Sequence, residues 1–130
     1  MQGIRDHRDR GAAAVEFALV ALLLVTLLMG VMEFGRMWAI QGSLAQASRD
    51  AARTAAITDD AAAGAAKFNE VFSPLAADGV LAGNTPVRSG TPGDEHCVWK
   101  VDASYQVNTL TRFFADTWTI TAKGAMRCNG

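Results

Sequence analysis

The chain lacks most of the side chains and motifs on which enzymes depend. It has two histidines and two cysteines in 130 residues, with no CxxC pair, P-loop, nucleophile elbow or zincin motif. His7 lies close to the N-terminus, and His96 stands beside Cys97, where a catalytic dyad would need a free thiol. We therefore expect no enzymatic activity, no cofactor and no metal site.

The net charge is close to zero, and prolines are few. The formal net charge is -1 and no basic block is present, which argues against nucleic acid as a partner. The first proline of the chain is Pro74, so no proline interrupts a helix before that position. A long N-terminal helix is therefore permitted.

The most prominent feature that is present is an apolar run with a polar leader before it. Residues 12–32 would span about 31 Å as a helix at 1.5 Å per residue, close to the thickness of the hydrocarbon core of a bilayer. Three arginines within residues 1–11 favour a cytoplasmic N-terminus. We predict that residues 12–32 cross a lipid bilayer and that the chain after them lies outside the cytoplasm.

Glu16 is the only ionisable residue in this apolar run. A charge at the centre of a bilayer costs about 2.5–3.5 kcal/mol on insertion scales, so carboxylates in membrane helices usually have a function. A plain single-pass anchor with Glu16 at the interface is also physically acceptable. A removed secretory signal peptide is a third interpretation, which Glu16 and the lack of a small-x-small site after Met32 disfavour.

Residues 10–24, RGAAAVEFALVALLL, resemble the start of a type IV prepilin. The resemblance implies that a prepilin peptidase cuts between Gly11 and Ala12 and leaves the apolar helix attached. Glu16 is then the fifth residue of the processed chain. Because a carboxylate in a low dielectric needs a partner, we expect Glu16 to pair with the α-amino group at Ala12 of a neighbouring subunit. That pair would set the register of assembly.

A longer stretch is similar to the TadE-like family, the minor pilin-like proteins of tight-adherence pili. The likeness lies in the opening GAAAVEFALV and in the alanine- and arginine-rich stretch at 46–56, and more loosely in a two-strand region with cysteines at 97–128. Phe17 stands where the much shorter major pilins usually have tyrosine. TadF-like proteins share the N-terminal pattern, as do the usually far longer TadG-like proteins.

This resemblance implies a minor pilin, or pseudopilin, of a tight-adherence (Tad/Flp) pilus system that acts in initiation, priming or capping, for adhesion and biofilm formation. Gly11 and Ala12 would be the processing site, and Glu16 and Phe17 the assembly residues. The implied partners are the prepilin peptidase, TadF-like and TadG-like proteins, the major Flp-type pilin and the inner-membrane assembly platform. The C-terminal part would be periplasmic, on a protein of the bacterial inner membrane, and entry into the extracellular pilus is left open.

The competing interpretation is an uncleaved single-pass anchor that presents a small periplasmic binding or sensory domain. It predicts that the chain keeps its first residues and tolerates Glu16→Ala. The secreted, soluble interpretation predicts instead that the whole apolar run is lost.

The chain after the apolar run continues in a helical pattern and then changes period. Apolar residues recur at steps of three and four, which predicts one helix from about Ala12 to about Ala56, with 33–56 outside the membrane. Residues 57–130 would form one small soluble domain. The predicted class is therefore α+β, a pilin-like long helix with a short second helix and a C-terminal antiparallel sheet.

The second helix is predicted over 61–72, with Thr58-Asp59 as its cap and the charge of Asp59 or Asp60 favouring its N-terminus. Residues 75–81 predict a short further turn of helix. Residues 83–95 are rich in glycine and proline and predict a loop. The acidic pair Asp94-Glu95 fits this turn region better than a metal site, and the same holds for Asp59 and its neighbour.

Two runs near the C-terminus alternate apolar and polar residues, which predicts two half-buried strands over 97–107 and 117–128. If Cys97 faces Cys128 in an antiparallel pair, the numbers of all facing residues add to 225. The apolar residues of the two runs then share one face and stand opposite one another. We therefore predict a hairpin closed by a Cys97–Cys128 disulfide, which contributes about 3–4 kcal/mol.

Two further features of the sequence each allow two interpretations. The hairpin connection 108–116 carries Leu110, Phe113 and Phe114, which either fold back on the core or form an exposed contact patch. Arg49 and Arg53 lie one helical turn apart, either on a solvated face or as a docking site for an acidic partner.

Overall fold

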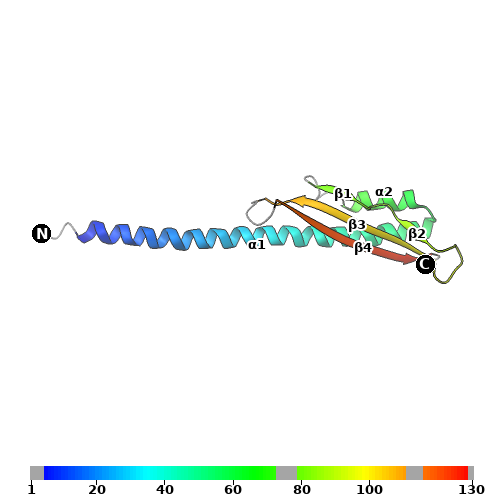
Figure 1. The fold of residues 1–130 in the computed structure, drawn as a ribbon, viewed down its shortest axis with the longest axis horizontal. Helices are drawn as coiled ribbons and strands as arrows, with labels where there is room; N and C mark the ends of the chain where they lie inside the picture. The colour runs from blue at the N-terminus through cyan, green and yellow to red at the C-terminus, as the bar shows by residue number, and fades with distance from the viewer. Residues whose placement is uncertain (1–4, 73–78, 111–115, 129–130) are drawn as a thin grey trace. The chain divides into compact units, whose positions relative to one another are not determined.

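The computed structural model describes residues 5–72, 79–110 and 116–128, with side chains from residue 11 onward. The elements are α1 (Arg5–Thr58), α2 (Ala61–Phe72), β1 (Val80–Ala82), β2 (Val87–Ser89), β3 (Val98–Asn108) and β4 (Thr117–Arg127) (Figure 1). The predicted α+β class is confirmed. By its internal contacts the chain divides into an N-terminal unit, Met1–Gly35, and a soluble unit, Arg36–Gly130, which are described separately below.

The long helix is present but extends further than predicted. α1 begins at Arg5, not near Ala12, and ends at Thr58, two residues after the predicted end. No glycine or proline interrupts the chain between Arg5 and Arg10, so the polar leader can continue the helical hydrogen bonding of the apolar run. Polarity marks the end of the membrane-compatible stretch, but it does not mark the end of the helix.

α2 has the predicted bounds, and its start is explained by one side chain. The Oδ1 atom of Asp60 accepts a hydrogen bond from the backbone N–H of Ala62 at 2.8 Å, which satisfies one of the unpaired donors of the first turn. Asp59 instead adopts a positive φ of 51°, a conformation in which Asp is several-fold enriched among non-glycine residues. The predicted cap, Thr58-Asp59, was therefore wrong: Asp60 is the cap and Asp59 makes the turn.

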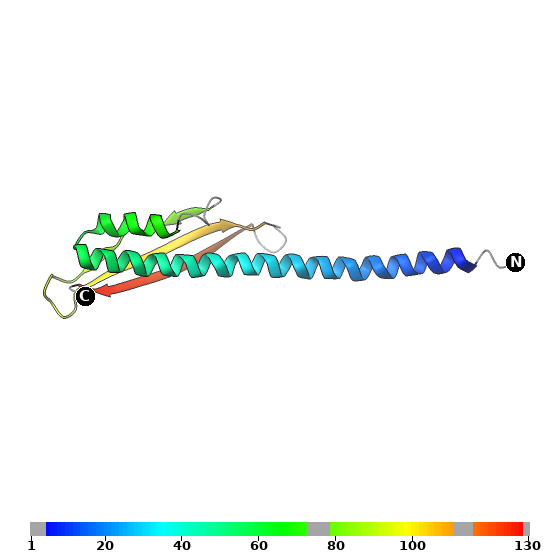
Figure 2. The ribbon, with the colours of Figure 1, turned by 180° about the vertical axis from the view of Figure 1, so that it is seen from behind.

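The sheet is built around β3 (Figure 2). β4 pairs with β3 along its whole length, with Cα partners from Val98 and Arg127 to Asn108 and Thr117. Every pair in this ladder adds to the predicted sum of 225. β1 and β2 both pair with the other edge of β3, near its opposite ends.

These two short strands are where the sequence-based prediction was wrong. Residues 83–95 were predicted as a loop, yet β2 lies within them and pairs with Val98–Lys100. Residues 75–81 were predicted as a turn of helix; their described part, 79–81, enters β1, and 75–78 lie outside the described residues. A strand of three residues is too short to show a period, and only the open edge of β3 makes these segments extended.

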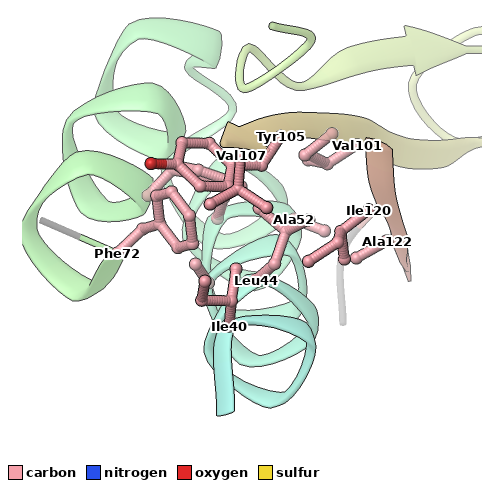
Figure 3. Packing of buried hydrophobic residues seen from close by; sticks show 13 residues of the cluster. Ile40, Leu44, Ala52, Phe72, Val101, Tyr105, Val107, Ile120 and Ala122 are labelled. Atoms are coloured by element: carbon pink, nitrogen blue, oxygen red, sulfur yellow. The ribbon is translucent and has the colours of Figure 1, made fainter. Parts of the chain in front are cut away.

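The core of the soluble unit lies between the inner face of the sheet and the two helices. Figure 3 shows Ile40 and Leu44 of α1 and Phe72 of α2 turned toward Val107 and Tyr105 of β3. The rings of Phe72 and Tyr105 meet edge to face, with centroids 5.2 Å apart. The remaining buried contacts of α1 in this cluster are made by small side chains: Ala47, Ala51 and Ala52.

Two glycines let backbones approach closely in this core. A Cβ atom on Gly124 of β4 would overlap the carbonyl oxygen of Ser48, so strand and helix are in direct backbone contact there. A Cβ on Gly64 of α2 would lie 2.8 Å from the carbonyl oxygen of Ala51, which brings α1 and α2 together in the same way. The alanines of α1 and these glycines together make a thin, tightly packed layer.

Candidate functional site

The predicted processing and assembly residues all lie on α1, in the N-terminal unit. Gly11, Ala12, Glu16 and Phe17 are exposed, and the exposed fraction of Phe17 is 74%. Ala12 and Glu16 are four residues apart and therefore share one face of the helix, one turn from each other. A Cβ atom added to Gly11 meets no atom within 4 Å, so packing within the described chain does not require glycine at this position.

The apolar stretch that follows has no internal partner. None of residues 11–35 is buried in the described structure, although leucine, alanine and valine dominate them. This helix is long and apolar enough to cross a membrane, and within the described residues it is the one helix that meets this description. The hydroxyl of Thr26 donates to the carbonyl oxygen of Leu22 at 2.8 Å, so this polar group is satisfied within the helix. Glu16 is left as the one charge of residues 12–32.

The cysteines meet at the open end of the β3–β4 hairpin, where they form the predicted disulfide. Cys97 and Cys128 have Cα atoms 5.4 Å apart, and the backbone N–H of Cys128 donates to the carbonyl oxygen of Cys97 at 3.0 Å. Cys97 is buried. The disulfide therefore links β3 and β4 at one end of the longest ladder of the sheet and leaves no free thiol among these residues.

A polar cluster that the sequence did not predict holds the turn between the helices. The Nη1 atom of Arg88 on β2 lies 2.7 Å from Oδ1 of Asp59. The same guanidinium lies 5.4 Å from the centroid of the Trp99 ring, within the range of a cation–π contact. The positive φ of Asp59 is therefore accompanied by an ion pair that ties α1 to the sheet. An Asp at the end of a helical pattern was the only local signal, and its partner is distant in sequence.

The second acidic pair forms a turn, as predicted. Asp94 accepts hydrogen bonds from the backbone N–H groups of His96, at 3.3 Å, and Cys97, at 3.1 Å. Over the described residues, no group of three or more His, Cys, Asp or Glu side chains is placed to hold a metal ion. Arg49 and Arg53 are both exposed on α1, and docking of an acidic partner there remains a prediction.

A shallow depression of about 350 Å³ lies on the soluble unit. It is lined by residues of the β1–β2 region and of β3: Gly83, Thr85, Val87, Ser89, Lys100 and Asp102. Lys123 on β4 reaches Asp102 at 3.4 Å. The exposed side of the sheet is therefore polar and pairs its own charges. The part of the hairpin connection at 111–115, with Phe113 and Phe114, lies outside the described residues.

Comparison with known proteins finds one similarity, in the N-terminal region. Residues 11–53 match the family model described as TadE-like protein. The match covers α1 from Gly11 to Arg53 and ends before α2 and the sheet, which confirms the resemblance over the stretch that carried it. The similarity is therefore to a pilus-associated structural family, and it extends over 43 of the 130 residues. No curated protein and no solved structure matches the chain.

Proposed function

We propose that this chain is a minor pilin-like subunit of a Tad/Flp pilus assembly system, processed between Gly11 and Ala12 by a prepilin peptidase. The observation that carries the proposal is the family match, which starts at Gly11, directly before the exposed apolar half of α1. After processing, residues 12–32 remain in the bacterial inner membrane and the soluble unit lies in the periplasm. The subunit then acts in initiation, priming or capping of the pilus, for adhesion and biofilm formation.

The position of Gly11 supports the processing step. Glycine within a helix costs about 1 kcal/mol relative to alanine, and nothing packs against Gly11 that would require it. A peptidase needs an accessible backbone at the bond it cuts, and a helix opens most easily where its propensity is lowest. Processing by a peptidase therefore explains a glycine at position 11, which packing within the described chain does not require.

The exposure of Glu16 supports a role in assembly. Its side chain is exposed on a helix whose neighbouring residues are apolar, and among the side chains that the structure describes no opposite charge pairs with it. Cleavage creates an α-amino group at Ala12, and that group on a neighbouring subunit supplies the opposite charge. One such pair per subunit fixes the axial register at which helices associate.

The exposed apolar surface of α1 supports the partners that this role requires. The same side chains can face lipid before assembly and other pilin-like helices after it, because both are apolar. The partners are then the prepilin peptidase, the TadF-like and TadG-like proteins, the major Flp-type pilin and the inner-membrane assembly platform.

The N-terminus of the membrane-extracted protein tests the processing step. We expect mass spectrometry and N-terminal sequencing to find Ala12 first in cells with an active prepilin peptidase, and Met1 first in cells without it. Gly11→Leu should block the cut, whereas Gly30→Leu, on the same apolar stretch and equally free of packing contacts, should not. An N-terminus at Met1 beside an active peptidase would contradict the proposal and favour the uncleaved anchor.

Glu16→Ala tests assembly independently of processing. We expect the variant to be cut normally and to lose pilus assembly in cells, because the unpaired α-amino group no longer finds a carboxylate. Val15→Ala, at the adjacent exposed position, is the matched control and should assemble. Normal piliation by the Glu16→Ala variant would show that register does not depend on this charge.

A further inference from the structure

β4 forms one margin of the sheet, and among the described residues it pairs with β3 alone. The strand has 11 residues and contains no proline. Its ladder with β3 keeps one register from end to end, so no bulge interrupts it. Native proteins usually protect an edge strand by short length, by proline or by a bulge. β4 has none of these three protections.

The hydrogen bonds at the two ends of the ladder show which backbone groups face the open edge. The backbone N–H of Cys128 donates to the carbonyl oxygen of Cys97 at 3.0 Å. At the other end, the N–H of Thr109 donates to the carbonyl oxygen of Asp116 at 3.2 Å. Bonded pairs recur at every second residue of an antiparallel ladder, so the even-numbered residues of β4 bond to β3. The odd-numbered residues therefore direct their N–H and C=O groups away from β3.

One position of this edge already has a partner, and the next positions do not. The Nε2 atom of Gln41 on α1 donates to the carbonyl oxygen of Thr121 at 3.1 Å, as expected for an outward-directed group. Lys123, Ala125 and Arg127 follow, and all three are exposed. Among the described residues, no hydrogen bond reaches their outward backbone groups. These three residues therefore offer a set of main-chain donors and acceptors to another strand.

The exposed face of β4 places two cations along this stretch. Lys123 and Arg127 are four residues apart, and because side chains alternate between the faces of a strand, both lie on the same face. Lys123 lies 3.4 Å from Asp102 on β3, so its charge is partly balanced. Arg127 forms no ion pair with the side chains that the structure describes.

α1 supplies two more cations on the other side of the edge. Gln41, which reaches β4, is followed at multiples of four residues by Arg49 and Arg53, so the three share one row of the helix surface. A Cβ atom on Gly124 would lie 2.9 Å from the backbone nitrogen of Arg49, so α1 passes directly beside β4 at this point. Both arginines are exposed, and neither forms an ion pair within the described part of the chain.

These charges decide which strand can pair with the edge. A second copy of β4 would bring the same cations against it, and like charges on neighbouring strands repel. In an extended acidic segment the side chains alternate between two faces. One face would meet Lys123 and Arg127, and the other would meet Arg49 and Arg53, so opposite charges stand on both sides.

We propose that the basic edge, defined as residues 123–127 of β4 with Arg49 and Arg53 of α1, binds an extended acidic segment of a partner protein as an additional strand. Main-chain hydrogen bonds to the odd-numbered residues supply the pairing, and the four cations select an acidic sequence. The inference goes beyond the proposed function and does not depend on it, because it uses contacts of the soluble unit alone.

Amide hydrogen exchange, measured by NMR on the full-length protein in detergent, tests the pairing. The probe is the peptide acetyl-Thr-Glu-Val-Glu-Val-Glu-Thr-amide at millimolar concentration, and the control peptide has lysine in place of glutamate. We expect the glutamate peptide to slow exchange at Lys123, Ala125 and Arg127 by about tenfold, and the lysine peptide to leave it unchanged. The amides of Gly124 and Met126, already bonded to β3, are the internal reference. Unchanged exchange at the three outward amides, or equal slowing by both peptides, would overturn the proposal.

A proline variant tests whether the peptide adds as a strand. Ala125→Pro removes one outward N–H and leaves the bonds to β3 in place, and proline is tolerated in an edge strand where the N–H faces solvent. We expect this variant to lose the effect of the glutamate peptide and Ala125→Val to keep it, with similar melting temperatures showing that both fold. Retained binding by a folded Ala125→Pro protein would mean that no strand is added.

Charge variants test the selection without altering the strand. Arg49→Gln/Arg53→Gln should weaken binding of the glutamate peptide about fivefold, through the loss of two exposed ion pairs. Lys67→Gln, on α2, is the matched control and should bind normally. Equal affinities in these variants would contradict the role of the two arginines.

An anionic lipid surface is the other ligand that a group of cations attracts. Bicelles that contain phosphatidylglycerol are therefore compared with the peptide in the same exchange experiment. Slowing of the three outward amides by these bicelles and not by the peptide would assign the basic edge to lipid headgroups and refute the protein partner.

Discussion

The two halves of α1 belong to one continuous helix, but they differ in whether the described chain covers their apolar side chains. In residues 12–32 the large apolar side chains point outward on all sides, and Leu24 is 52% exposed. In residues 36–58 one face of the helix is buried, and Leu44 on it is fully buried. The described residues therefore leave the N-terminal half uncovered, whereas the C-terminal half helps to make its own core.

The difference lies in side-chain size as well as in pattern. The N-terminal half is rich in leucine, which suits contact with lipid or other helices. The buried face of the C-terminal half is mostly alanine, with Ala47, Ala51 and Ala55 all fully buried. Small side chains let the sheet and α2 approach the helix backbone. The N-terminal half of α1 therefore has large, exposed side chains, whereas the C-terminal half has small side chains that pack closely against the sheet and α2.

The largest effect should come from the same substitution made in each half. Leu44→Ala should lower the free energy of unfolding of the soluble unit by about 4 kcal/mol, within the 2–5 kcal/mol typical of buried leucines. Thermal unfolding of the full chain in detergent, followed by near-UV circular dichroism, should shift down by about 15 °C or more. Leu24→Ala should leave this transition within about 2 °C. Similar shifts for both variants would show that the two halves are not energetically distinct.

Reduction of the disulfide should destabilise the soluble unit almost as strongly and leave the helix of residues 12–32 in place. Opening the Cys97–Cys128 link removes about 3–4 kcal/mol from the stability of the soluble unit, by the chain-entropy model for its loop. Residues 12–32 contain no cysteine, so their helix should persist. We expect near-UV circular dichroism to lose its cooperative transition at lower temperature after reduction, with far-UV helicity largely kept. The Cys97→Ala/Cys128→Ala variant should behave alike and should be insensitive to reductant.

A matched pair of glycine substitutions tests how closely β4 packs against α1. Gly124→Ala places a Cβ against the Ser48 backbone, and neither backbone can yield easily, so we expect a loss of about 2 kcal/mol. Gly30→Ala meets nothing within 4 Å and should not lower the same melting temperature. An unchanged transition for Gly124→Ala would mean that β4 and α1 are further apart than described.

The smallest effect concerns a polar contact at the surface of the soluble unit. Arg88→Gln removes the ion pair with Asp59 and the cation from the Trp99 ring, and should cost below about 1 kcal/mol, because exposed pairs are screened by water. The expected fall in melting temperature is a few degrees, and it should shrink as salt is added. Arg127→Gln, at an exposed position of β4, is the control and should change nothing measurable. A larger loss for Arg88→Gln would make this cluster part of the core.

The sequence alone determined the features that depend on the spacing of residues within one segment. The apolar run, the second helix and the ladder of β3 with β4 follow from periods of composition, and the cysteines fixed the register because the sum of 225 holds for every facing pair. The family resemblance likewise rests on contiguous residues, 11–53. These signals need no knowledge of distant parts of the chain.

Only the tertiary structure decided the features that join distant residues. β1 and β2 are strands because β3 offers an open edge; Arg88 finds Asp59 only once that edge is paired; and Gly124 is needed only because Ser48 approaches it. The apolar pattern also did not predict that α1 begins at Arg5, because helical hydrogen bonding continues into the polar residues before the apolar run. Pairing and close approach are properties of two segments together, so neither segment alone can encode them.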